Sequence, residues 1–196
     1  MESEEVPLND QLTKLSEPRR WHQQAYPVPV VAAIIRRAVV EESSYLLIER
    51  IHSPYAGKWA LVGGRWEFGE TLSDAVTREV LEETGLVTSF VAWRAFVSER
   101  LFPQTSNDLG AHFVIFVCEV QVGQAEAREQ TEGRVAWFTE DQITELHSRQ
   151  EMVPTDYQIW KHCLTPSMSL MHIEADLLVQ DMGSLASIMK RFEPRT

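Results

Sequence analysis

The sequence predicts an α/β fold, in which helices and a mixed β-sheet pack as layers around one core. Short runs of β-branched and aromatic residues alternate along the chain with segments of helical periodicity, and turn residues separate them. The chain has 196 residues, of which 44% are hydrophobic and 24% are charged. This length and balance suit one globular domain with short extensions.

The first third of the chain predicts a polar extension followed by three strands. Residues 1–26 are polar and interrupted by prolines, so we expect them to form an N-terminal extension. β-Branched and aromatic residues then dominate three short runs that are bounded by turn residues. The expected strands cover residues 27–40, 45–48 and 59–62, and the last of them stops at Gly63-Gly64.

A helix is expected over residues 72–84, because both of its ends carry a signal. Thr71 precedes Asp74 by three positions, which is typical of a residue that caps a helix N-terminus. Gly85 suits the left-handed position just beyond a helix C-terminus. The first helix of the domain is therefore delimited from local sequence alone.

The rest of the chain predicts three more strands and two more helices, followed by a tail. The strands are expected near residues 87–98, 111–121 and 135–138, and the helices over 139–147 and 155–163. From about residue 167 the pattern predicts a strand and then a helix. We expect the main domain to span residues 27–149 and a C-terminal extension to span residues 150–196.

The tail is more apolar than a solvated appendage should be. Its apolar residues therefore predict burial, either in the domain's own core or at the interface of a homodimer. The residues concerned are Met168, Leu170, Met171, Ile173, Leu177, Leu178, Leu185, Ile188 and Met189.

Charge and hydropathy exclude several classes of protein. The net charge of −11 argues against DNA or RNA binding through a broad basic surface. No apolar run is long enough for a transmembrane helix, and the acidic N-terminus lacks the features of a signal peptide. Cys118 and Cys163 have no metal-site spacing. We expect a cytoplasmic protein with reduced thiols and no membrane contact.

The predicted helix over residues 72–84 has an unusual inner face. Leu72, Ala75 and Val76 begin an apolar stripe that continues into Glu79, Glu82 and Glu83. These glutamates converge near the helix C-terminus, where the helix dipole disfavours anions. Two carboxylates about 4 Å apart repel by roughly 4 kcal/mol at an effective dielectric of 20. A divalent cation would relieve this repulsion, and it prefers oxygen ligands.

A solvated acidic face with helical salt bridges is the alternative interpretation. Arg78 is the nearby cation, and it precedes Glu82 in the less favourable order for an ion pair. One arginine does not offset three glutamates and the dipole, so the residues favour a metal site.

The same stretch matches a known motif. Gly64, Glu70, the run Arg78-Glu79-Val80, the pair Glu82-Glu83 and the pair Gly85-Leu86 have the spacing GX5EX7REUXEEXGU, where U is apolar. This pattern resembles the Nudix box at every fixed position. The flanking strands from about Pro27 to His147 also resemble a Nudix domain, whereas the two extensions do not clearly do so.

The resemblance implies an α/β/α sandwich with a mixed sheet, and metal-dependent hydrolysis of a diphosphate bond in a nucleoside diphosphate derivative, which is a small-molecule substrate. It implies Mg²⁺ or Mn²⁺ as the cofactor, and the Gly63 carbonyl, Glu79, Glu82 and Glu83 as metal ligands. Arg78 and Glu70 would orient this set through a mutual ion pair. Diphosphate cleavage needs neutralised phosphate oxygens and an activated water, which this chemistry supplies.

The resemblance does not identify which residue acts as the general base. Glu79 is one candidate, because it belongs to the box. Some family members use a carboxylate from a later loop, for which Glu129 and Glu132 are the candidates here. An ordinary surface role is the alternative for each of these two residues.

The substrate is indicated less directly. Pro103 follows Leu86 with sixteen residues between them, a spacing that resembles the ADP-ribose pyrophosphatase group. An ADP-ribose-like substrate is therefore favoured over two alternatives, a nucleoside triphosphate (including oxidised ones) and a role as a non-catalytic ligand sensor. Arg50 and Lys58 are candidates to bind phosphates, and Trp59 to stack on a base. Members of the ADP-ribose group are often dimers, which adds weight to a homodimer.

Overall fold

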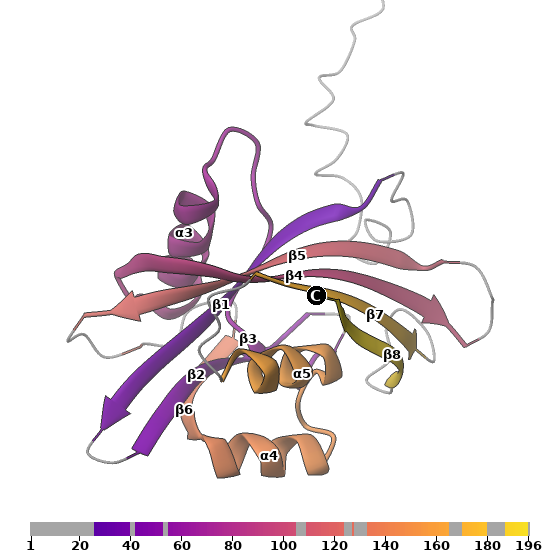
Figure 1. The fold of residues 1–196 in the computed structure, drawn as a ribbon. Coiled ribbons are helices and arrows are strands. Elements are labelled where there is room, and N and C mark those ends of the chain that lie inside the picture. The colour runs from indigo at the N-terminus through magenta and orange to yellow at the C-terminus, as the bar shows by residue number, and fades with distance from the viewer. Residues whose placement is uncertain are drawn as a thin grey trace, which may run out of the picture.

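A single mixed β-sheet forms the centre of the molecule, as the computed structural model in Figure 1 shows. The structure describes residues 26–39, 42–52, 55–104, 109–123, 127, 133–164, 170–179 and 187–195. The strands are β1 (Val28–Val39), β2 (Glu42–Arg50), β3 (Trp59–Leu61), β4 (Thr88–Pro103), β5 (Ala111–Val122), β6 (Gly133–Thr139), β7 (Met171–Val179) and β8 (Ser187–Arg195). The helices are α3 (Leu72–Thr84), α4 (Glu140–Ser148) and α5 (Pro154–Cys163).

The sheet contains both parallel and antiparallel neighbours, as the sequence predicted. Its strand order is β3-β2-β1-β5-β4-β7-β8, and β6 pairs with β2 off this path. Strands β1 and β5 run parallel at the centre, and so do β4 and β7. The remaining pairs, such as β4 with β5, are antiparallel. The fold is therefore α/β with a mixed sheet.

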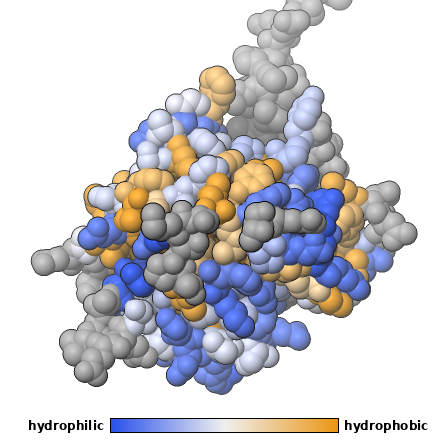
Figure 2. Space-filling view, viewed as in Figure 1, coloured by the Kyte–Doolittle hydropathy of each residue, from blue (hydrophilic) through white to orange (hydrophobic). Residues whose placement is uncertain are grey.

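The helices form two layers, one on each side of the sheet (Figure 1). Helix α3 contacts β1 and β4 on one face, whereas α5 contacts β3, β4 and β8 on the other, with α4 beside it. The surface over α4 is mostly hydrophilic (Figure 2), which agrees with its one buried residue, Ile143. No helix in the described ranges is long and apolar enough to cross a membrane.

The end of the tail is a strand, so the helix predicted there is wrong. Residues 187–195 form β8, which pairs antiparallel with β7. Local propensity is overridden because β7 would otherwise leave a row of backbone groups without partners at the sheet edge. Cross-strand ion pairs add to the pairing, since Arg191 Nε lies 2.9 Å from Asp176 Oδ2.

The apolar residues of β7 are buried inside the chain itself. Ile173, Ala175, Leu177 and Val179 are fully buried, and β7 extends the sheet at β4. Their burial requires no partner subunit. Met168 and Leu185 lie outside the described residues. Strand β7 thus belongs to the domain's own core, whereas Leu170 and Ile188 of the described tail are exposed, at 47% and 52% of their accessible surface. The homodimer stays a prediction.

Candidate active site

Helix α3 has the bounds and caps that the sequence predicted. The Thr71 hydroxyl accepts a hydrogen bond from the Asp74 backbone N–H at 3.2 Å. Gly85 follows the helix with φ of 70°, a left-handed conformation that glycine adopts without strain. Ala75 and Val76 are fully buried near the helix start, and this inner face continues into buried Glu79 and Glu83. Two residues of the predicted acidic stripe, Glu79 and Glu83, therefore face inward, whereas Glu82 is exposed.

The loop that connects β3 to this helix contains Gly63 and Gly64. Backbone hydrogen bonds of 2.8 Å fix the loop beside β1, from Val31 N to Gly64 O and from Ala33 N to Val62 O. A Cβ at Gly64 would lie 2.5 Å from a carboxylate oxygen of Glu79, so any larger residue would displace that carboxylate. Glycine is needed here because the backbone and the glutamate approach each other so closely.

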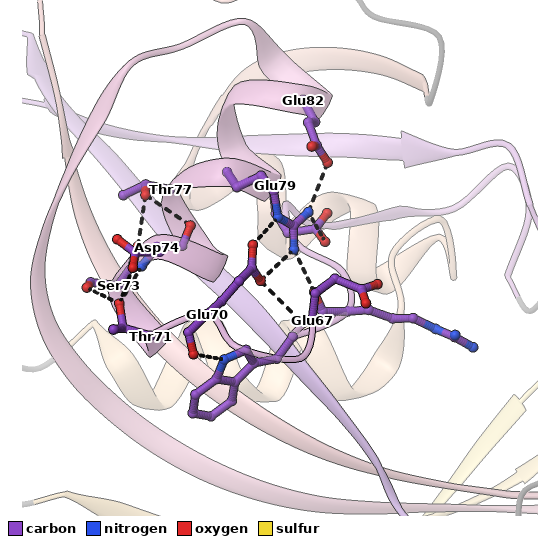
Figure 3. A network of polar contacts seen from close by, with 11 residues as sticks. Glu67, Glu70, Thr71, Ser73, Asp74, Thr77, Glu79 and Glu82 are labelled. Carbon is purple, nitrogen blue, oxygen red and sulfur yellow. Dashed lines mark hydrogen bonds and ion pairs between the residues drawn. The ribbon is translucent and has the colours of Figure 1, made fainter. Parts of the chain in front are cut away.

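One guanidinium group organises the acidic residues around it (Figure 3). Arg78 Nε and Nη2 donate to the two Glu70 oxygens at 2.6 and 3.1 Å, and this contact holds the pKa of Glu70 below its ordinary value. Arg78 Nη1 reaches Glu79 Oε1 at 2.8 Å and Glu82 Oε2 at 2.9 Å. Arg78 Nη2 also donates to the Arg65 carbonyl at 2.9 Å. The predicted ion pair of Arg78 with Glu70 is therefore formed.

Three of the four glutamates of the motif, Glu79, Glu82 and Glu83, line one cavity of about 500 Å³. Glu79 and Glu83 retain only 7% and 8% of their accessible surface, whereas Glu82 lies at the exposed rim. Glu83 Oε2 accepts the Gly63 backbone N–H at 2.9 Å, which ties the helix to the glycine loop. Gly63 and Gly64 line the same wall. We call this set, Gly63, Gly64, Glu79, Glu82 and Glu83, the glutamate wall.

The donors of the glutamate wall suit a hard divalent cation, because carboxylate and carbonyl oxygens are its preferred ligands. Within the described residues, no three acidic, histidine or cysteine side chains already converge as metal ligands would. Arg78 lies between Glu79 and Glu82 as their counter-charge. A cation that binds these carboxylates therefore has to compete with Arg78 for them.

The same cavity is lined by further polar residues, of which only Arg50 was predicted from the sequence. Glu99 from β4, Asp156 from α5 and Tyr55 from the loop after β2 line it, together with Arg50 at the end of β2. Burial raises the pKa of Glu99 to about 7 and that of Asp156 to about 6, against the opposing effect of nearby Arg50. The cavity thus contains carboxyl groups that titrate near neutral pH.

A signal for Glu99 does exist in the sequence. It occupies an inward position in the alternating pattern of β4, between Val97 and Leu101, both of which are fully buried. A charged residue on the apolar face of a strand is uncommon unless it has a partner or a function. Asp156 gives no such signal, because an acidic residue in the first turn of a helix is ordinary.

Only one of the three predicted substrate-binding residues lies at the cavity. Arg50 lines the cavity, but Lys58 and Trp59 do not. The Lys58 ammonium donates to the Gln150 carbonyl, and its burial lowers its pKa. Trp59 packs edge-on against Phe138, with ring centroids 4.6 Å apart. Nothing in these two positions supports a substrate contact. Glu129 and Glu132, the alternative bases, lie outside the described residues.

Comparisons with known proteins agree on one domain type. The family model for the NUDIX domain matches residues 27–162. An ADP-ribose pyrophosphatase of Methanocaldococcus jannaschii is 27% identical over 153 residues, which cover 77% of this chain and 85% of that protein. The NAD-capped RNA hydrolase NudC of Haemophilus influenzae is 33% identical over 121 residues, which cover 61% of this chain and 42% of that protein.

The fold has a solved counterpart as well. The crystal structure of the MutT protein from Bacillus halodurans has a TM-score of 0.62 to this chain. The match covers 85% of this chain and 97% of that one, at 22% sequence identity. At this identity the likeness concerns the fold alone.

Proposed function

Because this chain belongs to the Nudix family of pyrophosphohydrolases, we propose that its cavity cleaves a diphosphate bond in a nucleoside diphosphate derivative. The observation that carries this proposal is the glutamate wall. Three carboxylates of one helix line a cavity of about 500 Å³, and two of them are buried. A cavity of this size suits a small nucleotide.

Family members generally use divalent metals, and we assign Mg²⁺ or Mn²⁺ to the Gly63 carbonyl, Glu79, Glu82 and Glu83. When bound, such a cation neutralises phosphate oxygens and makes water more acidic. Glu79 is our first candidate for the base that accepts a proton from the attacking water, because it is buried and lines the cavity. Arg78 and Glu70 are assigned as positioning residues.

Two features support an ADP-ribose-like substrate. The relative from Methanocaldococcus jannaschii is an ADP-ribose pyrophosphatase, and the matched region covers 85% of it. The spacing from Leu86 to Pro103 points to the same group. We keep Arg50 as a substrate-binding residue, because it lines the same cavity as the glutamate wall. We do not extend this assignment to Lys58 and Trp59.

A substrate panel with Mg²⁺ tests the proposal. We expect ADP-ribose to give AMP and ribose 5-phosphate, with a higher kcat/KM than any nucleoside triphosphate, oxidised ones included. The variant Glu83→Gln should abolish most of this activity. Glu145→Gln, an exposed position on α4, is the matched control and should retain it. A triphosphate preferred by tenfold would instead make the chain a triphosphate pyrophosphohydrolase, and an inactive protein would support the sensor alternative.

We also propose a homodimer, as the sequence predicted. The buried residues of the described tail lie within the chain's own core, but Leu170 and Ile188 are exposed and remain available to a partner subunit. Light scattering at micromolar concentration gives the mass directly. A monomer mass would end this proposal and leave the assignment of the glutamate wall unchanged.

A further inference from the structure

Strand β4 has an open edge along its first half. One side of the strand pairs with β5 from its first residue, whereas β7 joins the other side only from Ala95 to Pro103 (Figure 1). Among the described residues, no strand pairs with Thr88–Trp93 on the side away from β5. The outward backbone groups of an edge strand are a template for pairing with another strand. We call the segment Val87–Trp93 the open edge.

Large apolar side chains are exposed at the open edge. Val87, Phe90, Val91 and Trp93 retain 75%, 36%, 49% and 40% of their accessible surface. Leu81, on the helix that leads into this segment, retains 48%. The open edge contains no charged residue and no proline, which are two of the means by which edge strands avoid pairing with another chain. Its composition therefore favours strand pairing.

We propose that the open edge is a dimer interface, at which it pairs antiparallel with the same segment of a second copy of this chain. A two-fold axis perpendicular to the strand produces this pairing, and it joins the sheets of the two copies into one. This inference rests on the homodimer proposed above and gives it an interface. It does not depend on the reaction assigned to the cavity.

The charge of the chain favours a second copy at this segment. With a net charge of −11, two copies repel each other over much of their surface. The open edge is uncharged and apolar, so repulsion is small there and burial is favourable. In a two-fold pairing, β-branched and aromatic side chains meet their own kind across the strands, and such pairs stabilise sheets. A basic partner protein would find no charge to recognise at this segment.

The exposed area is sufficient for a stable interface. A large apolar side chain has roughly 200 Å² of accessible surface, so a half-exposed one offers roughly 100 Å². Leu81 and the four exposed side chains of the open edge therefore offer roughly 1,000 Å² in a dimer, which is about the minimum for a specific interface. The paired backbones add to this area. Leu170, which is 47% exposed, precedes Met171, the partner of Ala95 where the open edge ends.

The geometry of β4 limits the contact to a pair. Strand β7 occupies this side of β4 from Ala95 onward. Two bulges, between Phe90 and Ala92 and between Trp93 and Ala95, interrupt the pairing of β4 with β5. Bulges increase the local twist, which opposes the long, flat pairing found in fibrils. Each copy uses this segment once, so the two-fold contact closes at two subunits.

A charge at the open edge tests the interface. Val91 is 49% exposed in the single chain, so Val91→Lys should fold, as circular dichroism can verify. Two lysines would face each other near the axis, and we expect the dissociation constant of the dimer to rise at least about 100-fold. Leu109→Lys is the matched control, because Leu109 is 48% exposed and lies before β5, away from the open edge. Light scattering over a range of concentrations gives the dissociation constants, and the control should match the parent.

Disulfide crosslinking locates the contact. A residue near a two-fold axis lies close to its own copy, and a disulfide needs Cα atoms about 4.4–6.8 Å apart. Among Phe90→Cys, Val91→Cys and Ala92→Cys, at least one should form a linked dimer on mild oxidation, at a yield at least about tenfold above that of Leu109→Cys.

The outcomes separate the interface from the reaction. A monomeric parent, a dimer that Val91→Lys leaves intact, or crosslinking no greater than that of Leu109→Cys would overturn the interface. Val91 lies outside the cavity, so the monomeric variant should keep the parent's kcat for ADP-ribose. A dimer with the expected properties that hydrolyses no diphosphate would overturn the proposed reaction and leave the interface in place.

Discussion

Arg78 and Glu70 form a two-point ion pair, in which Nε lies 2.6 Å from Oε1 and Nη2 lies 3.1 Å from Oε2. Two parallel hydrogen bonds fix the plane of the guanidinium group, which a single contact would leave free to rotate. The same group then reaches Glu79 and Glu82 through its third nitrogen. Glu70 thus orients two carboxylates of the glutamate wall without lining the cavity itself.

Glu70→Gln should therefore lower activity, although Glu70 does not line the cavity. The amide cannot accept two hydrogen bonds from Arg78, so the guanidinium group and the carboxylates beside it lose their fixed positions. We expect turnover or metal affinity to fall about 10- to 100-fold, as is typical when residues that support metal ligands are lost. Steady-state kinetics across a Mg²⁺ titration measures both. Parent-like values for both quantities would show that the ion pair does not position the site.

The two glycines of the loop should respond differently to alanine. A Cβ at Gly64 meets the flexible Glu79 carboxylate at 2.5 Å, so Gly64→Ala should reduce turnover strongly and stability little. A Cβ at Gly63 meets the Val31 backbone oxygen at 2.1 Å, so Gly63→Ala should chiefly lower the melting temperature. Gly123→Ala, where a Cβ has no neighbour within 4 Å, is the matched control. Equal losses of stability in the first two variants would refute this distinction.

Charge removal within the glutamate wall should affect turnover more than folding. Glu83→Gln keeps an oxygen that can accept the Gly63 N–H, and Glu82 is exposed, so both glutamine variants should fold. We expect each to reduce kcat by at least about 10², since a charge that holds the cation is lost. Circular dichroism verifies folding before the rates are compared. Near-normal rates in both folded variants would show that the site is assigned to the wrong residues.

The free energy of unfolding should depend on pH through Glu99. Burial raises its pKa from 4.5 to about 7, so the folded protein binds this proton more tightly than the unfolded chain does. The folded state is consequently destabilised as the pH rises from 4.5 to 7, and by a constant amount above that range. Glu99→Gln does not titrate, so its stability relative to the parent should increase by about 3 kcal/mol over this range. Urea unfolding at several pH values measures the difference, and parallel pH curves for the two proteins would contradict it.

Local sequence predicted the acidic helix well, because its determinants are local. The cap at Thr71, the terminator Gly85 and the stripe that turns from Val76 to Glu79 all act within one or two helical turns. The ion pair of Arg78 with Glu70 came from the family pattern, and the structure confirms it. The mixed sheet followed from the order of the elements, although its strand order did not.

Features that depend on contacts distant in sequence could not be predicted in the same way. Glu99 and Asp156 lie on separate elements, and only the fold brings them to one cavity. Strand β8 was taken for a helix because its pairing with β7 is a tertiary effect. Lys58 was expected in the substrate site for its charge, yet it binds the Gln150 carbonyl instead. Local patterns do not contain these pairings.

The central claim is that diphosphate hydrolysis depends on a divalent cation held by the glutamate wall. The most direct measurement is AMP release from ADP-ribose by metal-stripped protein, followed during titration with Mg²⁺ for the parent and for Glu83→Gln. The parent should be inactive in excess EDTA and regain full turnover with Mg²⁺, whereas Glu83→Gln should stay at least about 10²-fold below that turnover throughout the titration. Full activity of the parent in excess EDTA would contradict the claim.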